Sequence, residues 1–278
     1  LFTQWGATAA PKILADVDGE VKQIFGWDTD AASAEYTGFL KAFLEALQAH
    51  LWANDRLSRC YFHVSDEPSM DALESYGRAA AVVDEALGGE CPLSDYAFYE
   101  KGLVKHPIPA NNHVDTFLDH GVEHLWTYYC CGQGEDVSNR FMAMPSARNR
   151  ILGAQLFKYH IEGFLQWGYN FWYSMLSKRP IDPYAETGAE DAFPAGDAFL
   201  VYPGPDGEPV PSIRQLVFHE GLQDLRALQL LEQKLPHEAI VALLEQDGAV
   251  KFKEYPRTSQ AVLAMRERVN RKIQELWG

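Results

Sequence analysis

Two adjacent carboxylates, Asp66 and Glu67, follow a short apolar run and precede a proline. The run over 59–65 predicts a buried strand that ends at these two acids. Ionised carboxylates are costly to desolvate, so a fold seldom keeps them beside an inner strand without a use. In α/β proteins, active sites are built where strands end. The pair therefore indicates acid/base chemistry.

Neighbouring carboxylates repel, so one tends to keep its proton while the other is ionised. Ordinary glycosidases place two carboxyl groups on opposite sides of the scissile bond, about 5 to 9.5 Å apart. Asp66 and Glu67 more naturally act together on one side of a sugar. That arrangement favours substrate-assisted hydrolysis, in which the 2-acetamido oxygen of the substrate is the nucleophile. The alternative is that Asp66 caps a helix beginning near Ser69 and that Glu67 is simply solvated.

Strand-like and helix-like segments alternate along the chain, which is typical of an α/β fold with a parallel sheet. Apolar spacing predicts helices over 36–51, 69–87, 147–161, 212–234, 236–246 and 259–276. Strands are predicted over 1–5, 24–27, 59–65, 95–99, 124–131, 163–172 and 197–202. We therefore expect a (β/α)8 TIM-type barrel that lacks its first strand or strands. Residues 1–278 would form a single domain, the C-terminal part of a longer protein.

Strand alternation predicts which side chains face a ligand. In the segment 164–172, one face carries polar groups and a glycine and suits the barrel interior: Gln166, Gly168, Asn170 and Trp172. The other face suits the helical layer: Leu165, Trp167, Tyr169 and Phe171. By the same rule His63, Ser65 and Glu67 share a face, and Tyr202 ends a strand. The strand over 124–131 is ambiguous, because both of its faces carry aromatic residues.

Aromatic residues are frequent, with seven Trp and thirteen Tyr, and several stand at predicted strand ends. Pyranose rings stack their apolar faces on aromatic rings, and the polar tips of Tyr and Trp bind hydroxyl groups. The alternative for any one of them is ordinary core packing. The aromatic residues together with the acid pair predict a sugar substrate.

The formal charge of −15, with no basic run, argues against nucleic acid as a partner and against a polyanionic substrate. No apolar run is long enough to span a bilayer. The chain begins at Leu1 without a signal-peptide pattern. No HxH, HExxH or compact Cys/His cluster indicates a metal, so no metal and no cofactor are predicted.

The segment HVSDEP at 63–68 resembles the catalytic segment of glycoside hydrolase family 123. Supporting matches are FGWD at 25–28, LWTY at 125–128, WGYNFW at 167–172, GDAFLVYPG at 196–204 and the helix over 212–224. The resemblance implies a retaining β-N-acetylgalactosaminidase with a (β/α) barrel, in which Asp66 stabilises the acetamido group and Glu67 is the acid/base. The expected substrate-binding residues are His63, Trp27, Asp28, Tyr128, Tyr129, Asn170, Trp172 and Tyr202.

Two alternatives stay open. A two-carboxylate glycosidase acting on other sugars would pair Glu67 with Asp28, Glu100 or Asp197. A non-catalytic carbohydrate-binding protein would keep only the aromatic pocket. In each case the expected partner is a glycan or glycoconjugate, and we expect the protein to meet it outside the cytoplasm.

Overall fold

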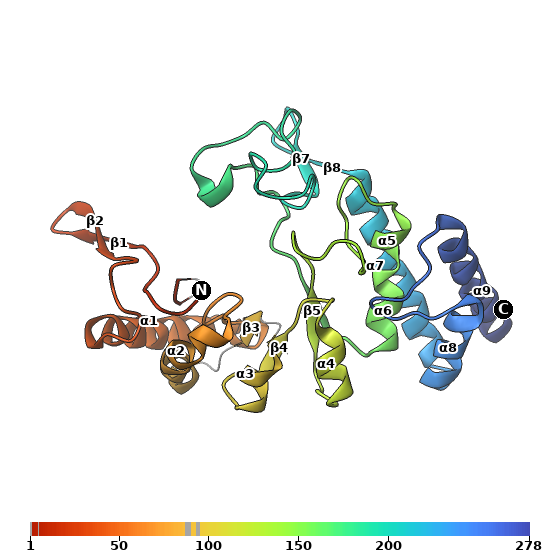
Figure 1. Ribbon diagram of the computed structural model, residues 1–278, viewed down its shortest axis with the longest axis horizontal. Coiled ribbons are helices and arrows are strands. Elements are labelled where there is room, and N and C mark those ends of the chain that lie inside the picture. The colour runs from red at the N-terminus through yellow and green to blue at the C-terminus, as the bar shows by residue number, and fades with distance from the viewer. Residues whose placement is uncertain (1, 5, 87–89, 93–94) are drawn as a thin grey trace. The chain divides into compact units, whose positions relative to one another are not determined.

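The computed structural model describes residues 2–4, 6–86, 90–92 and 95–278. Its backbone divides into two compact units, Leu1–Pro109 and Ala110–Gly278. Figure 1 labels helices and strands in both units, and each unit is described by itself. The expectation of a single domain stays a prediction. No helix among the described residues is both long and apolar enough to cross a membrane.

The first unit begins with an antiparallel hairpin of β1 (Ile13–Val17) and β2 (Glu20–Phe25). Its two-residue turn, Asp18-Gly19, has both φ angles positive, which suits the right-handed twist of a hairpin. The helix α1 (Ala34–Ala53) follows, and the Ser33 hydroxyl caps it by accepting a bond from the amide of Tyr36. This helix confirms the one predicted over 36–51.

The rest of the first unit contains short elements around the acid pair. They are η1 (Leu57–Arg59), η2 (Met70–Ala72), α2 (Leu73–Ala86), β3 (Glu90–Pro92), α3 (Tyr96–Glu100) and β4 (His106–Ile108). The strands β3 and β4 pair in parallel, with α3 between them along the chain. The helix predicted over 69–87 is confirmed as η2 and α2 within the described residues. Residue 87, the last one predicted for this helix, lies outside them.

Two predicted strands of the first unit are wrong. The segment 95–99 is the helix α3, because the Asp95 carboxylate accepts a hydrogen bond from the amide of Ala97 and caps a helical turn. The segment 59–65 starts in a 3₁₀ turn and forms no regular strand. Residues 1 and 5 of the strand predicted over 1–5 lie outside the described residues, and residues 2–4 form no strand.

The second unit starts with α4 (Val114–Asp119), followed by β5 (Trp126–Tyr128), α5 (Ala147–Arg150), α6 (Leu152–Lys158) and β6 (Gly163–Leu165). The strands β5 and β6 pair in parallel. The helix predicted over 147–161 is confirmed as α5 and α6. The strands predicted over 124–131 and 163–172 are much shorter than expected.

The chain then runs through η3 (Met175–Ser177), and the segment 178–196 contains no helix or strand. An antiparallel pair follows, β7 (Val201–Pro203) with β8 (Pro209–Pro211). Three helices complete the unit as predicted: α7 (Ile213–Glu232), α8 (His237–Leu244) and, after η4 (Glu245–Asp247), α9 (Ser259–Trp277).

A hydrophobic core lies among the helices of the second unit. Buried residues of α5, α6, α7, α8 and α9 form one apolar cluster that includes Phe157, Leu228, Leu231, Ile240 and Val262. The helices α6 and α7 approach closely at two glycines. A Cβ on Gly153 would lie 1.8 Å from the carbonyl oxygen of Gly221, so neither position accepts a side chain without movement.

The described strands form four two-stranded sheets, and no closed barrel is found among them. The architecture is a mixed α/β fold. Each parallel pair, β3–β4 and β5–β6, is a strand–helix–strand crossover, the unit from which parallel sheets are built. The α/β class predicted from the sequence is therefore confirmed, whereas the (β/α)8 barrel stays a prediction.

Candidate active site

The acid pair lies in the first unit, in a loop that the N-terminal residues hold in place. The amide of Phe2 donates to the carbonyls of His63 (3.3 Å) and Val64 (3.2 Å). The amide and the hydroxyl of Thr3 both donate to the carbonyl of Val64, at 3.1 and 2.9 Å. The chain before Asp66 is thus fixed by main-chain pairing even though it forms no regular strand.

Burial changes abruptly across the pair. Val64 and Ser65 are buried, Asp66 is half-buried, and Glu67 is exposed. Glu67 has a φ of +41°, in the left-handed region that non-glycine residues seldom adopt. This conformation breaks the strand alternation, so the predicted common face for His63, Ser65 and Glu67 is wrong: Ser65 is buried where Glu67 is exposed. Uncommon backbone conformations of this kind cluster at functional sites.

The environment of Asp66 and His63 shifts the pKa values of both side chains. Burial, and next the negative charge of Glu67, raises the pKa of Asp66 from 3.8 to about 6. Burial also lowers the pKa of His63, whose Nδ1 is buried without a hydrogen bond among the described residues. The acid pair therefore lies close to a histidine whose environment favours the neutral ring.

The capping alternative for Asp66 is not supported. The 3₁₀ turn η2 has Ser69 as its N-cap residue, with no side-chain cap hydrogen bond. Within the described part of the chain, no hydrogen bond reaches the Asp66 carboxylate. A half-buried carboxyl group that no structural bond uses is available for a ligand.

Trp27 and Asp28 follow β2 in the same unit. They occupy a turn in which the amide of Thr29 donates to the carbonyl of Gly26 at 2.9 Å. The Trp27 ring is 58% exposed, and the Lys12 ammonium lies 4.7 Å from its centroid. Asp28 is exposed. An exposed indole of this kind can stack on a sugar, and the lysine already covers part of it.

The other predicted sugar-binding residues lie in the second unit, and three of them are brought together. Asn170 forms an antiparallel bridge with Phe199, and the indole nitrogen of Trp172 donates to the carbonyl of Val201 at 3.0 Å. The Tyr202 ring lies 5.3 Å from that of Phe199. Because the Trp172 N–H is already bonded, its half-buried ring is what it can offer a ligand.

Tyr128 and Tyr129 form a separate group at the end of β5. Both are buried, and the Tyr129 ring meets Phe164 edge-on, with centroids 4.8 Å apart. Burial raises the pKa of Tyr129. Trp167 and Tyr169, predicted to face the helical layer, are instead 41% and 46% exposed.

A buried polar cluster around Asp197 is the feature that the sequence did not resolve. Asp197 is 0% exposed, and its Oδ2 accepts a hydrogen bond from the Trp167 indole at 3.1 Å. Burial raises the pKa of Asp197 to about 6, and the positive charges of Arg140 and Arg214 act in the opposite direction. Burial lowers the pKa of Arg140 to about 10.

Both arginines of this cluster are held by carbonyl oxygens. Arg140 donates to the carbonyls of Gly168 and Asp197, and Arg214 to those of Gly196 and Phe199. The Asp197 Oδ1 and the Tyr129 hydroxyl are buried without a hydrogen bond among the described residues. Arg140 lies in a loop without periodic pattern, so no sequence signal pointed to it. Asp197 was considered only as an alternative catalytic partner.

Comparison with known proteins agrees with the sequence resemblance. Residues 1–231 match the family model described as glycoside hydrolase 123, catalytic domain. Among solved structures, a family 123 glycoside hydrolase from Clostridium perfringens, described in a study of glycolipid glycan hydrolysis, matches with a TM-score of 0.60 and 18% identity. The alignment covers 94% of this chain and 48% of that one, so this chain spans about half the length of that protein. No match is found among curated proteins.

Proposed function

Because the chain belongs to the glycoside hydrolase 123 family, we propose that it hydrolyses terminal β-linked 2-acetamido sugars, N-acetylgalactosamine in particular, with retention of configuration. The observation that carries this proposal is the adjacent pair Asp66 and Glu67. One carboxyl group is half-buried with a raised pKa, and the other is exposed in a left-handed backbone conformation. The family match covers both residues.

In the proposed reaction the substrate supplies its own nucleophile. Asp66 accepts a hydrogen bond from the acetamido N–H and holds the group beneath the anomeric carbon. The acetamido oxygen attacks that carbon while Glu67 donates a proton to the departing glycosidic oxygen. Glu67, now ionised, removes a proton from water, which opens the cyclic cation at the anomeric carbon. Two displacements give net retention.

The proposed role of Asp66 fits its charge at neutral pH. With a pKa of about 6, Asp66 is mainly ionised at pH 7 and can stabilise a cationic intermediate. We propose that His63, Trp27 and Asp28 contact the sugar from the same unit. For the second unit we propose Asn170, Trp172, Tyr202, Tyr128 and Tyr129 as sugar-binding residues.

The architecture and the location of the protein stay part of the proposal. The two parallel strand–helix–strand pairs support a (β/α)8 barrel. Action on glycans outside the cytoplasm is consistent with the substrate class. Fractionation of the native cell, with this protein detected by antibody, would test the location.

A substrate panel tests the function. We expect hydrolysis of aryl 2-acetamido-2-deoxy-β-galactosides, slower hydrolysis of the gluco epimers, and no measurable turnover of β-galactosides that lack the acetamido group. A thiazoline mimic of the cyclic intermediate should inhibit strongly, since transition-state analogues bind 10²–10⁸-fold more tightly than substrates. Equal rates with and without the acetamido group would exclude the substrate-assisted route.

A second candidate function is favoured by Asp197, which also has a raised pKa of about 6 and could act as a general acid. A two-carboxylate glycosidase using Glu67 and Asp197 would act on sugars without an acetamido group, and the thiazoline would not inhibit it. The hydrogen bond from Trp167 to Asp197 and the two arginines near Asp197 instead favour a role for this residue in positioning the loop.

A carbohydrate-binding protein without catalytic activity is the third candidate. It would hydrolyse no glycoside in the panel, and calorimetry would still detect sugar binding.

A further inference from the structure

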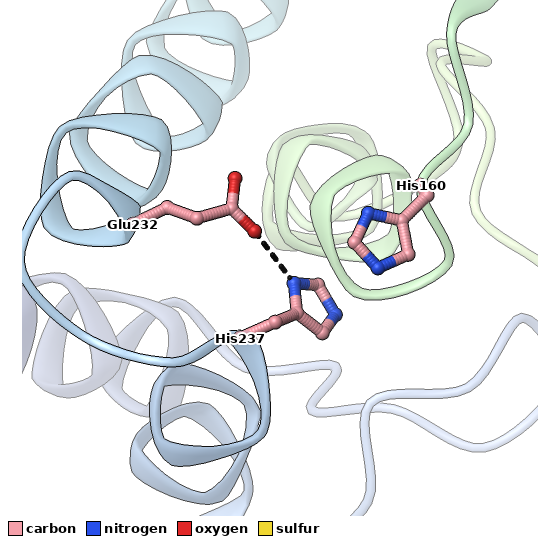
Figure 2. A group of neighbouring side chains, drawn as sticks. All are labelled: His160, Glu232 and His237. Carbon is pink, nitrogen blue, oxygen red and sulfur yellow. Dashed lines mark hydrogen bonds and ion pairs between the residues drawn. The ribbon is translucent and has the colours of Figure 1, made fainter.

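Three side chains from separate parts of the second unit converge near the C-terminal end of α6. His160 follows that helix, Glu232 is the last residue of α7, and His237 is the first residue of α8. One potential ligand atom of each lies within 4.8 Å of those of the other two. Figure 2 shows the Glu232 carboxylate and the His160 ring both turned toward the His237 ring. Glu232 and His237 lie beyond the residues that the family model matches.

The hydrogen bonds of His237 orient its ring so that Nδ1 faces Glu232. Its Nε2 lies 3.1 Å from the carbonyl oxygen of Lys158, which can only accept, so Nε2 carries a hydrogen and donates it. Its Nδ1 lies 2.9 Å from Oε1 of Glu232, as the dashed line in Figure 2 shows. Histidines that bind metals commonly donate the other ring N–H to a backbone carbonyl in this way. A metal ion bound here would take the place of the hydrogen between Nδ1 and Oε1 of Glu232.

The backbone at His160 is a second, independent indication. His160 has a φ of +52°, and its amide donates to the carbonyl of Phe157 as the helix ends. This left-handed position at a helix end is usually occupied by glycine. A histidine here is unfavourable for the backbone, and its ring stacks on that of His237 with centroids 3.9 Å apart. The conformation thus places an imidazole where it completes the group.

The ammonium groups of the nearby lysines have other partners, so they do not compete with a metal ion for Glu232. The ammonium of Lys158 pairs with Glu245 at 2.7 Å. That of Lys234 lies over the ring of Trp277, 5.8 Å from its centroid. Phe157 stacks near the His237 ring with centroids 4.9 Å apart, which limits the orientations the ring can take. The group therefore combines one carboxylate and two imidazole rings, and contacts limit the orientation of one of those rings, that of His237.

We propose that His160, Glu232 and His237 bind a divalent transition-metal ion such as Zn²⁺. Two imidazole nitrogens and one carboxylate oxygen suit zinc, with water as the fourth ligand, whereas calcium and magnesium need more oxygen ligands. A tetrahedral ion with bonds of about 2.0–2.1 Å separates its ligands by about 3.3 Å. The exposed His160 and Glu232 side chains would rotate to reach this geometry, and the His160 ring would leave its stacked position on His237.

The bound ion would tie the end of α6 to the turn between α7 and α8. Its role is therefore structural, and it goes beyond the proposed hydrolysis, in which none of these three residues takes part. The site could not be predicted from the sequence, because His160 is distant along the chain from Glu232 and His237 and the three residues match no metal-binding motif.

Titration of the full chain with Zn²⁺, in competition with a chromophoric chelator, tests the proposal. We expect one equivalent to bind, with affinity lowered at least 10-fold in His160→Gly and in Glu232→Gln. Cobalt(II) in place of zinc should give the intense visible absorption of a tetrahedral ion. The matched control is His219→Ala, an exposed histidine on α7 outside the group, which should bind zinc as the wild type does.

The His160→Gly variant separates loss of the ligand from loss of the fold. Glycine relieves the left-handed backbone, so without metal this variant should be at least as stable as the wild type. Zinc at 100-fold excess over its Kd should raise the unfolding temperature of the wild type and of His219→Ala by about 5 °C or more, and that of His160→Gly not at all.

Three results would overturn the proposal. They are no binding to the wild type, unchanged binding in His160→Gly, and equal loss of binding in His219→Ala. Unchanged binding in His160→Gly would place zinc elsewhere, for example at the thiols of Cys130 and Cys131.

Discussion

Replacing Asp66 with Asn should make the protein more stable at neutral pH while it removes a proposed catalytic group. Burial, and next the negative charge of Glu67, raises the pKa of Asp66 in the folded chain to about 6 from 3.8. The folded state therefore binds the proton more tightly than the unfolded state does. Wild-type stability should fall as pH rises from about 4 to about 6, and the loss should persist above pH 6.

The size of the effect follows from the shift. The difference between about 6 and 3.8 is about 2 pKa units, and each unit corresponds to about 1.36 kcal/mol, so the loss is at most about 3 kcal/mol. An Asn side chain has nearly the same shape and never ionises. At pH 7.5 the Asp66→Asn variant should thus exceed the wild type by about 1–3 kcal/mol in free energy of unfolding, and at pH 4 the two should be nearly equal.

Urea unfolding of both proteins at pH 4 and pH 7.5 measures this difference. The control is Asp71→Asn, which removes an exposed carboxylate from η2 in the same segment. Its effect should be within about 0.5 kcal/mol at either pH. A variant Asp66→Asn that is no more stable than wild type at pH 7.5, or whose advantage is the same at pH 4, would refute the electrostatic reasoning.

Two further predictions concern the helical core of the second unit. Gly153→Ala should destabilise the protein by about 1–3 kcal/mol or more, because the added Cβ would lie 1.8 Å from the carbonyl oxygen of Gly221. A variant that melts at the same temperature as the wild type would contradict this close contact between α6 and α7. Asp224→Ala should cost about 3–5 kcal/mol, because two arginines would lose the carboxylate that they share. The half-buried Arg150 makes two bonds to it, at 2.7 and 2.9 Å, and Arg266 makes one at 2.7 Å. Calorimetry checks both, and an Asp224→Ala loss below about 1 kcal/mol would show that solvent replaces the ion pairs.

The helices were predictable because their apolar spacing extends over several turns. Within α7, Leu228 and Leu231 lie on one face and fill the core, so a local pattern determines the element. The strands were predicted too long because aromatic residues are common both in strands and in loops. The segment 95–99 reads as a strand by composition, yet a single capping carboxylate at Asp95 makes it helical.

The acid pair could be found from the sequence because its two residues are adjacent and stand beside a proline. The conformation of Glu67 and the raised pKa of Asp66 could not, since both depend on how the chain is folded around them. Residues that act together from distant positions were missed for the same reason. Arg140 meets Asp197, and His160 meets His237, only after folding.

The most direct test of the central claim is steady-state kinetics of Glu67→Gln on two β-N-acetylgalactosaminides, one with an alkyl and one with a nitrophenyl leaving group. Loss of a general acid slows a reaction by about 10²–10⁴-fold, and a poor leaving group needs the proton most. We predict a fall of kcat by at least 10²-fold on the alkyl glycoside and a smaller fall on the nitrophenyl glycoside. Near wild-type rates on both would contradict a catalytic role for Glu67.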